Sequence, residues 1–284
     1  MLVHDPHRFV NELDEASLDL LVHRLESRAK NPVFAQLLDK YSSRIIAEKP
    51  EKILEFGCGT GAVLRALAMR DDFNGHAIGV DHCAAFINAA NKFSQQEKVA
   101  DRLAFRVGDV HELDIPSASF DVVIAHTLLS HVTEPAKVLS EMARIVRPNG
   151  KIIIFDGDYT SLTYAYPDHG FGQKMDAALS NTTFNNPRIM HDLPRLLPAF
   201  GLRMAEAWGD AVVEIGEGNF YKTFAEAYVP YVKKTGVLTT QAIDIWLSEQ
   251  YKAMEKGTFF AACNYYTYFI ERVRDRPVNI SRVK

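Results

Sequence analysis

The sequence is poor in cysteine and has no long apolar run. Its three cysteines, Cys58, Cys83 and Cys263, lie far apart, and this spacing favours reduced thiols over a zinc site or a redox disulfide. No segment approaches the roughly 18 apolar residues of a membrane span, and residues 1–15 contain histidines and acids where a signal peptide would be apolar. We therefore expect a soluble, cytoplasmic protein without a membrane segment.

Basic residues do not gather in a block anywhere in the chain. The formal net charge is −4, which gives no reason to expect a nucleic acid as the main partner. Internal repeats and low-complexity linkers are also lacking. The 284 residues are therefore expected to form one domain, residues 1–284, and the oligomeric state cannot be predicted from this sequence.

Short apolar segments alternate with helical ones from Lys52 onward. This alternation is typical of a mostly parallel sheet with helices on both faces, so we predict an α/β fold of the Rossmann-like, doubly wound type. The segments expected to be strands are 52–56, 76–81, 103–109, 120–125 and 151–156, then 203–215 and 259–273 near the end of the chain. The helices expected between the first five strands lie near 60–70, 83–97 and 134–147.

The segments that flank this alternating core read as mostly helical. Apolar residues recur at helical spacing over residues 12–47, with a break at Pro32. After Asp156 the alternation lapses, and it resumes with a helix expected at 189–200. The expected division is an N-terminal helical cap at 1–47, a cofactor-binding core at 48–156, and helical lid insertions on the substrate side at 157–187 and 218–256.

Three glycines, Gly57, Gly59 and Gly61, occupy alternate positions directly after the first expected strand, in ILEFGCGTGAV (53–63). Ligands of a doubly wound sheet bind beyond the carboxyl ends of its strands, where the strand order reverses. A glycine turn there lets a ligand approach the main chain and meet the N–H groups of the next helix. The glycines alone are also compatible with a tight strand-to-helix turn that binds nothing.

Acidic residues mark the ends of the first three expected strands, at Glu55, Asp81 and Asp109. Asp81 could bind the hydroxyls of a ribose, which fits a dinucleotide as well as other adenosine ligands. The glycines, however, are spaced G-x-G-x-G and not G-x-G-x-x-G, and three carboxylates would repel a diphosphate. These features together predict an adenosine ligand that is positively charged or zwitterionic.

At these positions the sequence resembles the class I S-adenosylmethionine-dependent methyltransferases, of the type that acts on small molecules. EFGCGTG (55–61) is similar to the first motif of that family, and GVD (79–81) to the acidic end of its second strand. GDVHELDIPSASFDVV (108–123) and VLSEMARIVRPNGKIIIF (138–155) resemble the segments that lead into its fourth and fifth strands. The family usually has Pro-Gly-Gly where this chain has Pro148, Asn149 and Gly150.

The resemblance implies a seven-stranded sheet whose last strand is antiparallel, and S-adenosyl-L-methionine as the cofactor. Its glycine turn would wrap the methionine part, Asp81 would hold the ribose, and Asp109 with the Val110 amide would bind the adenine. Arg28 is expected to bind the cofactor carboxylate, because related enzymes fold an N-terminal helix over the site. The full set of expected cofactor-binding residues is Arg28, Glu55, Gly57, Cys58, Gly59, Thr60, Asp81, His82, Asp109, Val110 and His126.

Methyl transfer from a sulfonium requires alignment and the exclusion of water more than it requires catalytic groups. His126 and His131 are the candidate catalytic residues, with His169 and Asp158 as further options for a base. No metal is expected, because IAHT (124–127) supplies no carboxylate. Asp156 and Asp158 could bind a cationic acceptor or only cap a loop.

Aromatic residues in the two insertions are expected to enclose a small, partly aromatic or apolar acceptor. They are Tyr159, Tyr164, Tyr166, Phe171 and Phe184 in the first insertion, and Phe220, Tyr221, Phe224, Tyr228 and Tyr231 in the second. The predicted function is therefore methyl transfer to such an acceptor by direct displacement. The alternatives are a methyltransferase that acts on RNA or protein, a non-catalytic protein that binds S-adenosylmethionine, and a nicotinamide-dependent dehydrogenase.

Overall fold

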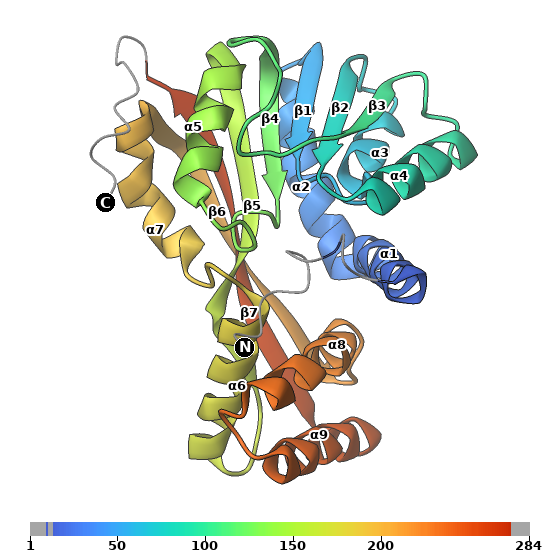
Figure 1. Ribbon diagram of the computed structural model, residues 1–284, viewed down its shortest axis with the longest axis vertical. Helices are drawn as coiled ribbons and strands as arrows, with labels where there is room; N and C mark the ends of the chain where they lie inside the picture. The colour runs from blue at the N-terminus through green and yellow to red at the C-terminus, as the bar shows by residue number, and fades with distance from the viewer. Residues whose placement is uncertain (1–9, 11–13, 274–284) are drawn as a thin grey trace.

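The computed structural model describes residue 10 and residues 14–273, and all of its strands belong to one sheet (Figure 1). The strands are β1 (Lys52–Phe56), β2 (His76–Asp81), β3 (Leu103–Val107), β4 (Phe120–His126), β5 (Val146–Tyr164), β6 (Leu202–Gly216) and β7 (Phe259–Arg272). Their order is β3-β2-β1-β4-β5-β7-β6, with β1 to β5 parallel and β7 antiparallel to both of its neighbours. This confirms the predicted doubly wound sheet with an antiparallel last strand.

Helices cover both faces of this sheet (Figure 1). The helices of the core are α2 (Pro32–Ala47), α3 (Ala62–Ala68), α4 (Ala84–Gln96), α5 (Pro135–Ile145) and α7 (Ile189–Leu196), the last continued by a 3₁₀ turn at Leu197–Phe200. On one face Leu37 of α2 and Leu64 of α3 join one apolar cluster with Ile53 of β1. On the other face Met142 of α5 and Leu193 of α7 join one apolar cluster with strand residues. Strands covered in this way must be apolar throughout, as the sequence pattern predicted.

The N-terminal helical segment is broken where Pro32 was expected to break it. Helix α1 (Glu15–Lys30) ends before Asn31, and α2 begins at Pro32. Proline suits the first helical position because it lacks an N–H that would go unpaired there. The side chain of Asn31 accepts a hydrogen bond from the Val33 N–H at 3.0 Å and so caps α2. α1 contains no fully buried residue, and it lies over the carboxyl ends of the core strands (Figure 1).

Strand β5 runs further than the sequence predicted, because it continues past Asp156 to Tyr164. The polar segment GDYTSLTY (157–164) has no apolar alternation, and its strand conformation depends on pairing with β7 that reaches Tyr164 and Ala261. Helix α6 (His169–Thr183) follows, within the insertion that was expected to be helical, although the sequence did not predict its bounds. Two glycines in its first turn lower the helix propensity of this segment, although Asp168 caps the helix by accepting a hydrogen bond from the Phe171 N–H.

The extended parts of β5, β6 and β7 carry a second group of helices beyond the core (Figure 1). This group, which we call the lower lobe, contains α6, α8 (Phe220–Thr235) and α9 (Thr240–Glu255). Trp246 of α9 is fully buried, and its ring lies 5.1 Å from that of Tyr164 at the end of β5. Across residues 14–273, no helix combines the length and the apolar character needed to cross a membrane.

Candidate functional site

A cavity of about 430 Å³ opens where the strand order reverses, between the carboxyl ends of β1 and β4. Ligands of doubly wound folds bind at this position. Every residue predicted to bind the cofactor lines this cavity, and so does His131. The residues concerned are Arg28, Glu55, Gly57, Cys58, Gly59, Thr60, Asp81, His82, Asp109, Val110, His126 and His131.

The glycine turn after β1 forms one wall, and its backbone explains the glycines. Gly57 and Gly59 have φ values of 64° and 51°, in the left-handed region that favours glycine. A Cβ on Gly57 would lie 2.5 Å from Leu128, whereas a Cβ on Gly59 would meet only Leu25 of α1, at 3.3 Å. At Gly59 the turn is therefore bounded only by Leu25 of α1, and no other protein atom blocks a ligand that passes along the backbone there.

Asp81, at the end of β2, holds the glycine turn in place. Its Oδ2 accepts a hydrogen bond from the Gly59 N–H and its Oδ1 accepts one from the Cys83 N–H, both at 2.9 Å. Burial raises the pKa of Asp81, and these two hydrogen bonds oppose that rise. Each carboxylate oxygen can accept a further hydrogen bond, so the residue can shape the turn and still bind two hydroxyls.

Glu55, in β1, is almost completely buried, and its Oε2 has no hydrogen-bond partner among the described residues. Burial, together with the charge of Asp81, raises the pKa of Glu55 well above its usual range. A bound cation would relieve this cost, because an opposite charge stabilises the ionised form. The arrangement therefore fits an ammonium group or a sulfonium beside Glu55.

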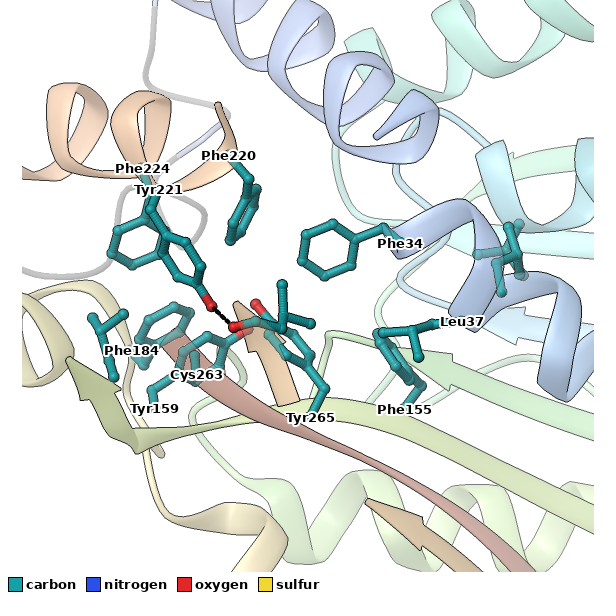
Figure 2. Close-up of a cluster of buried hydrophobic side chains, with 14 of the residues drawn as sticks. Phe34, Leu37, Phe155, Tyr159, Phe184, Phe220, Tyr221, Phe224, Cys263 and Tyr265 are labelled. Carbon is teal, nitrogen blue, oxygen red and sulfur yellow. Dashed lines mark hydrogen bonds between the residues drawn. The ribbon is translucent and has the colours of Figure 1, made fainter. Parts of the chain in front are cut away.

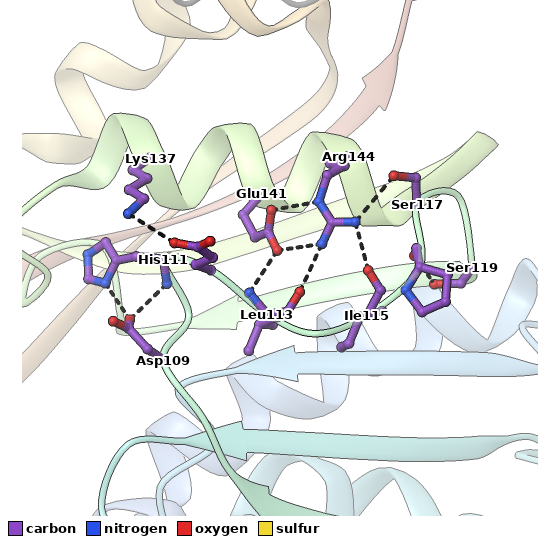
Figure 3. Close-up of polar contacts among 11 residues, drawn as sticks. Asp109, His111, Leu113, Ile115, Ser117, Ser119, Lys137, Glu141 and Arg144 are labelled. Atoms are coloured by element: carbon purple, nitrogen blue, oxygen red, sulfur yellow. Dashed lines mark hydrogen bonds and ion pairs between the residues drawn. The ribbon is translucent and has the colours of Figure 1, made fainter.

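The loop after β3 brings Asp109 and Val110 to the cavity, and polar contacts fix its course (Figure 3). Glu141 of α5 accepts a hydrogen bond from the Leu113 N–H at 2.9 Å, and Arg144 donates to the carbonyls of Leu113 and Ile115. Asp109 itself is mostly exposed, and its Oδ1 accepts hydrogen bonds from the N–H and the ring of His111. His111 also lines the cavity, although the sequence analysis did not select it.

The electrostatic state of Asp109 differs from that of the two buried acids. Burial by itself raises the pKa of Asp109, but the hydrogen bonds from the main chain and ring of His111 outweigh it and hold the pKa below its usual value. Asp109 is therefore a carboxylate at neutral pH. It can accept a hydrogen bond from an exocyclic amine such as that of adenine.

Helix α1 contributes Arg28, whose guanidinium is only partly satisfied. Its Nη1 donates to Thr127 Oγ1 at 3.0 Å, while Nε and Nη2 are buried without a partner among the described residues. Thr127 has φ 50°, a conformation that is rare for a β-branched residue, and it directly follows β4. The two unpaired donors of Arg28 fit a carboxylate, as the sequence analysis expected.

A buried ion-pair network attaches α1 to the core. Arg65 of α3 is 4% exposed and pairs with Glu26 of α1, at 2.6 Å, and with Glu97 at the end of α4. Glu26 lies on α1 between the positions of Leu25 and Arg28, which face the cavity. The network therefore fixes the helix that covers the glycine turn.

His126, the last residue of β4, is held on two sides. Its Nδ1 lies 2.7 Å from the hydroxyl of Tyr41, and its ring stacks on Phe155 with the ring centroids 4.6 Å apart. Burial and the nearby charge of Arg28 lower the pKa of His126 well below its usual value. His126 is therefore neutral at pH 7 and a weak base.

Aromatic side chains line the part of the cavity that faces the lower lobe (Figure 2). Five of the ten aromatic residues expected there do line it: Tyr159, Phe184, Phe220, Phe224 and Tyr228. The other five pack elsewhere among the described residues: Tyr164, Tyr166, Phe171, Tyr221 and Tyr231. Phe34, Tyr265 and Arg24 also line this part of the cavity, and the sequence analysis did not select them.

Three further candidates lie outside the cavity. Asp156 is fully buried and accepts hydrogen bonds from Ser130 and from the Gly157 N–H, so it caps a loop and does not face an acceptor. Asp158 accepts from Thr160 and lies 2.8 Å from His191 Nε2. His169 is exposed in the first turn of α6. The expectation that Asp158 or His169 could serve as a base is therefore wrong.

Cysteine chemistry and a metal centre find no support in this site. Burial raises the pKa of the Cys58 thiol well above its usual range, so Cys58 packs as a small neutral residue in the turn. Among the described residues no group of three or more His, Cys, Asp or Glu side chains is arranged to hold a metal ion. The orphaned Glu55 and Arg28 atoms, the unblocked main chain at Gly59, and Asp81 together fit S-adenosylmethionine, which carries an amine, a carboxylate and a ribose.

Comparisons with known proteins agree with this geometry. Residues 54–154 match the family described as "Methyltransferase domain". A 37.1 kDa protein of transposon TN4556 from Streptomyces fradiae is 29% identical over 184 residues, which cover 64% of this chain and 50% of that protein. The 27-O-demethylrifamycin SV methyltransferase of Amycolatopsis mediterranei is 29% identical over 131 residues, which cover 46% of this chain and 47% of the relative. The chain thus spans about half the length of these two relatives.

Solved structures share the fold at low sequence identity. The YcgJ protein of Bacillus subtilis superposes with a TM-score of 0.53 and 17% identity, covering 81% of this chain and 97% of that structure. The [4+2]-cyclase SpnF gives a TM-score of 0.55 and 15% identity, covering 84% of this chain and 81% of the other. Likeness at this level shows the fold, and the activity must be argued from the site.

Proposed function

Because the chain belongs to the class I S-adenosylmethionine-dependent methyltransferases, we propose that it transfers a methyl group from S-adenosylmethionine to a small, partly aromatic or apolar acceptor. The whole chain, residues 1–284, would act as one methyltransferase domain, with α1 and the lower lobe enclosing the acceptor. The observation that carries the proposal is a single cavity that joins the glycine turn and Asp81 at one end to Phe184 and Tyr228 at the other.

The cofactor would lie across the carboxyl ends of β1, β2 and β3. Glu55 would bind the amino group, and the unpaired donors of Arg28 would bind the carboxylate. Asp81 would accept from the ribose hydroxyls, and Asp109 with His82 would border the adenine. When bound, the cofactor supplies a methyl group on a positively charged sulfur, which a nucleophilic atom of the acceptor takes by direct displacement.

The protein contributes alignment and a dry site. Helix α1 covers the glycine turn, with Leu25 above Gly59, and the aromatic wall excludes water from the acceptor end. A cavity bordered by α1 and α8 suits a small molecule better than a polymer such as RNA or a folded protein. His126 is neutral and hydrogen-bonded to Tyr41, and it would place an uncharged side chain beside the sulfonium.

His131 is the better candidate for a base. It lines the cavity, and its ring lies 5.1 Å from Phe184 in the aromatic wall, where an acceptor would stack. We expect His131→Asn to lower kcat about 100-fold while the Kd of S-adenosylhomocysteine stays constant, because general bases contribute about that much to proton transfer. Steady-state kinetics with calorimetry would measure both, and an unchanged kcat would remove His131 from the mechanism.

The proposal as a whole is tested in two steps. Calorimetry should first detect binding of S-adenosylhomocysteine and no comparable binding of NADH, which excludes a dehydrogenase. Incubation with S-adenosylmethionine labelled in its methyl group and extracts of the source cell, followed by mass spectrometry, should then identify a small labelled product. Labelled RNA or protein would favour a different acceptor class, and binding without any labelled product would indicate a protein that does not methylate.

A further inference from the structure

The acceptor end of the cavity carries a positive charge that the proposed cofactor does not use. Arg24 of α1 lines the cavity beside the aromatic residues, and its guanidinium carbon lies 4.1 Å from the centroid of the Tyr228 ring and 5.8 Å from that of Phe224. Stacking of this kind fixes the plane of the guanidinium while leaving its N–H groups available. Arg24 is therefore held in one orientation at the wall of the cavity.

One donor of Arg24 has no partner. Its Nη1 is buried and makes no hydrogen bond with any described residue. A buried charged donor without an acceptor is costly, and one that lines a cavity can be satisfied by an acceptor on a bound ligand. Arg28 lies four residues later, on the same face of α1, and its own unpaired donors are those assigned above to the cofactor carboxylate. Arg24 is thus a second cation that still needs an anion.

The acids of the cavity cannot supply that anion. Among the described residues that line it, the only carboxylates are Glu55, Asp81 and Asp109, at the cofactor end after β1, β2 and β3. The lining residues contributed by α1, α8 and the extended parts of β5 and β7 include no acid. Asp156 and Asp158 are buried under this end but bind Ser130 and His191 instead. The cavity is therefore anionic at one end and cationic at the other.

We propose that the acceptor carries an anionic group, a carboxylate or a phosphate, and that Arg24 binds this group. The inference rests on the proposed function and names the acceptor class for that same site. The aromatic or apolar body of the acceptor lies against Phe184, Phe224 and Tyr228, whose rings are stacked or tilted against one another with centroids 4.7 to 6.4 Å apart. Its nucleophilic atom then points away from Arg24, toward the cofactor end.

The test uses the full chain saturated with S-adenosylhomocysteine, so that only the acceptor end is free. Probes that share a phenyl ring and differ in charge are titrated by calorimetry: 4-hydroxybenzoate and phenyl phosphate as anions, 4-hydroxybenzamide as the neutral analogue of the carboxylate, and tyramine as a cation. We expect at least one anion to bind about tenfold or more tightly than the neutral probe, since a charge-assisted hydrogen bond accounts for such a factor. The preferred anion then distinguishes a carboxylate from a phosphate.

Variants of α1 attribute the preference to one residue. Arg24→Gln should reduce the anion preference to within about twofold, and Arg24→Lys should keep part of it, because a lysine retains the charge without the planar donors. Lys30→Gln removes the same charge from an exposed position on the same helix and should leave the preference intact. In all three variants the affinity for S-adenosylhomocysteine should stay unchanged, which also shows that they fold.

Two results would overturn the inference. One is the absence of any anion preference in the wild-type chain, including the case in which no probe binds, and the other is a preference that survives in Arg24→Gln. A protein that binds S-adenosylhomocysteine but shows either result keeps the proposed function and loses only this assignment. A protein that does not bind S-adenosylhomocysteine at all refutes the proposed function itself.

Discussion

The two ends of the cavity are built in different ways. The cofactor end consists mainly of main chain and carboxylates from the ends of β1 and β2 and from the short loops after β1, β2 and β3. Each strand end and the loop after it are continuous in sequence. The acceptor end consists of side chains from α1, α8 and the extended β5 and β7, which lie far apart in the chain. A ligand that recurs across a family can be bound by a local motif, whereas a ligand particular to one protein is bound by a surface that only the complete fold assembles.

The two ends also differ in charge and in rigidity. Glu55 and Asp81 are buried acids, and the glycine turn is fixed by the hydrogen bond from the Gly59 N–H to Asp81. At the acceptor end, binding would depend on stacked rings and on Arg24. Changes at one end should therefore alter the affinity for one ligand and leave the affinity for the other unchanged.

Replacing Gly59 by valine should abolish binding of S-adenosylhomocysteine, with a Kd raised by more than roughly 100-fold. An added Cβ meets only Leu25 within the protein, at 3.3 Å, so we expect the valine to project toward the proposed path of the ligand while the fold survives. Gly236→Val is the matched control, because Gly236 has a similar φ of 68° and no atom within 4 Å of an added Cβ. Calorimetry with circular dichroism checks both variants, and normal binding by Gly59→Val would refute the proposed path of the cofactor.

Replacing Asp81 by alanine should weaken the binding of S-adenosylhomocysteine by about 1 to 3 kcal/mol, the contribution of one or two buried hydrogen bonds. The loss combines the ribose contacts with the hydrogen bonds from the Gly59 N–H, in the glycine turn, and from the Cys83 N–H, after β2. Asp81→Asn keeps one acceptor oxygen, so its Kd for S-adenosylhomocysteine should lie between those of the wild type and of Asp81→Ala. The preference for anionic probes should stay as in the wild type, and an equal loss at both ends would argue against separate sites.

The cofactor end could be predicted from the sequence more fully than the acceptor end, because most of its residues lie close together in the chain. Glu55, Gly57 and Asp81 were found because the end of a strand and the turn after it are neighbours both in sequence and in space. His111 lies within a recognised motif and was still missed, because its hydrogen bond to Asp109 has no signature in the sequence. Arg28 was selected from its place on a helix expected to cover the site.

The acceptor end was less predictable because it depends on long-range pairing. Tyr265 reaches the cavity because β7 is inserted between β5 and β6, and pairs Tyr265 with Gly157 and with Asp210. The extension of β5 escaped prediction because pairing with β7, and not local pattern, stabilises it. The bounds of α6 escaped prediction because two glycines lie in its first turn. Arg24 could have been identified, since it precedes Arg28 by four residues and helical side chains at that spacing share a face.

Helix α1 is the element that the two ends share, so loosening it should affect both. Glu26→Ala removes one of the two acids that pair with the buried Arg65, and Glu97 still compensates part of the charge. We expect the Kd values of S-adenosylhomocysteine and of the anionic probes each to rise by about three- to tenfold, roughly 1 kcal/mol, because both arginines of α1 lose their fixed position. Glu15→Ala, at an exposed position in the first turn of α1, is the control. An effect on only one ligand would show that α1 does not connect the ends.

Asp176 of α6 provides a change confined to the lower lobe. Burial raises the pKa of Asp176 to about 7, although hydrogen bonds from Tyr164 and Thr163 oppose the rise. A carboxyl whose pKa is higher in the folded state than in the unfolded state favours folding when it is protonated. The contribution of Asp176 to the free energy of unfolding is therefore complete below about pH 4 and is lost as the pH rises through 7. Asp176→Asn should therefore flatten the fall in stability between pH 4 and 7 and stabilise the protein by about 1 kcal/mol at pH 8, as measured by urea denaturation.

The exposed Asp114→Asn should leave the profile unchanged, and the Kd of S-adenosylhomocysteine should be the same in all three proteins. A change in that Kd for Asp176→Asn would show that the lower lobe and the cofactor end are coupled, contrary to the separation argued here.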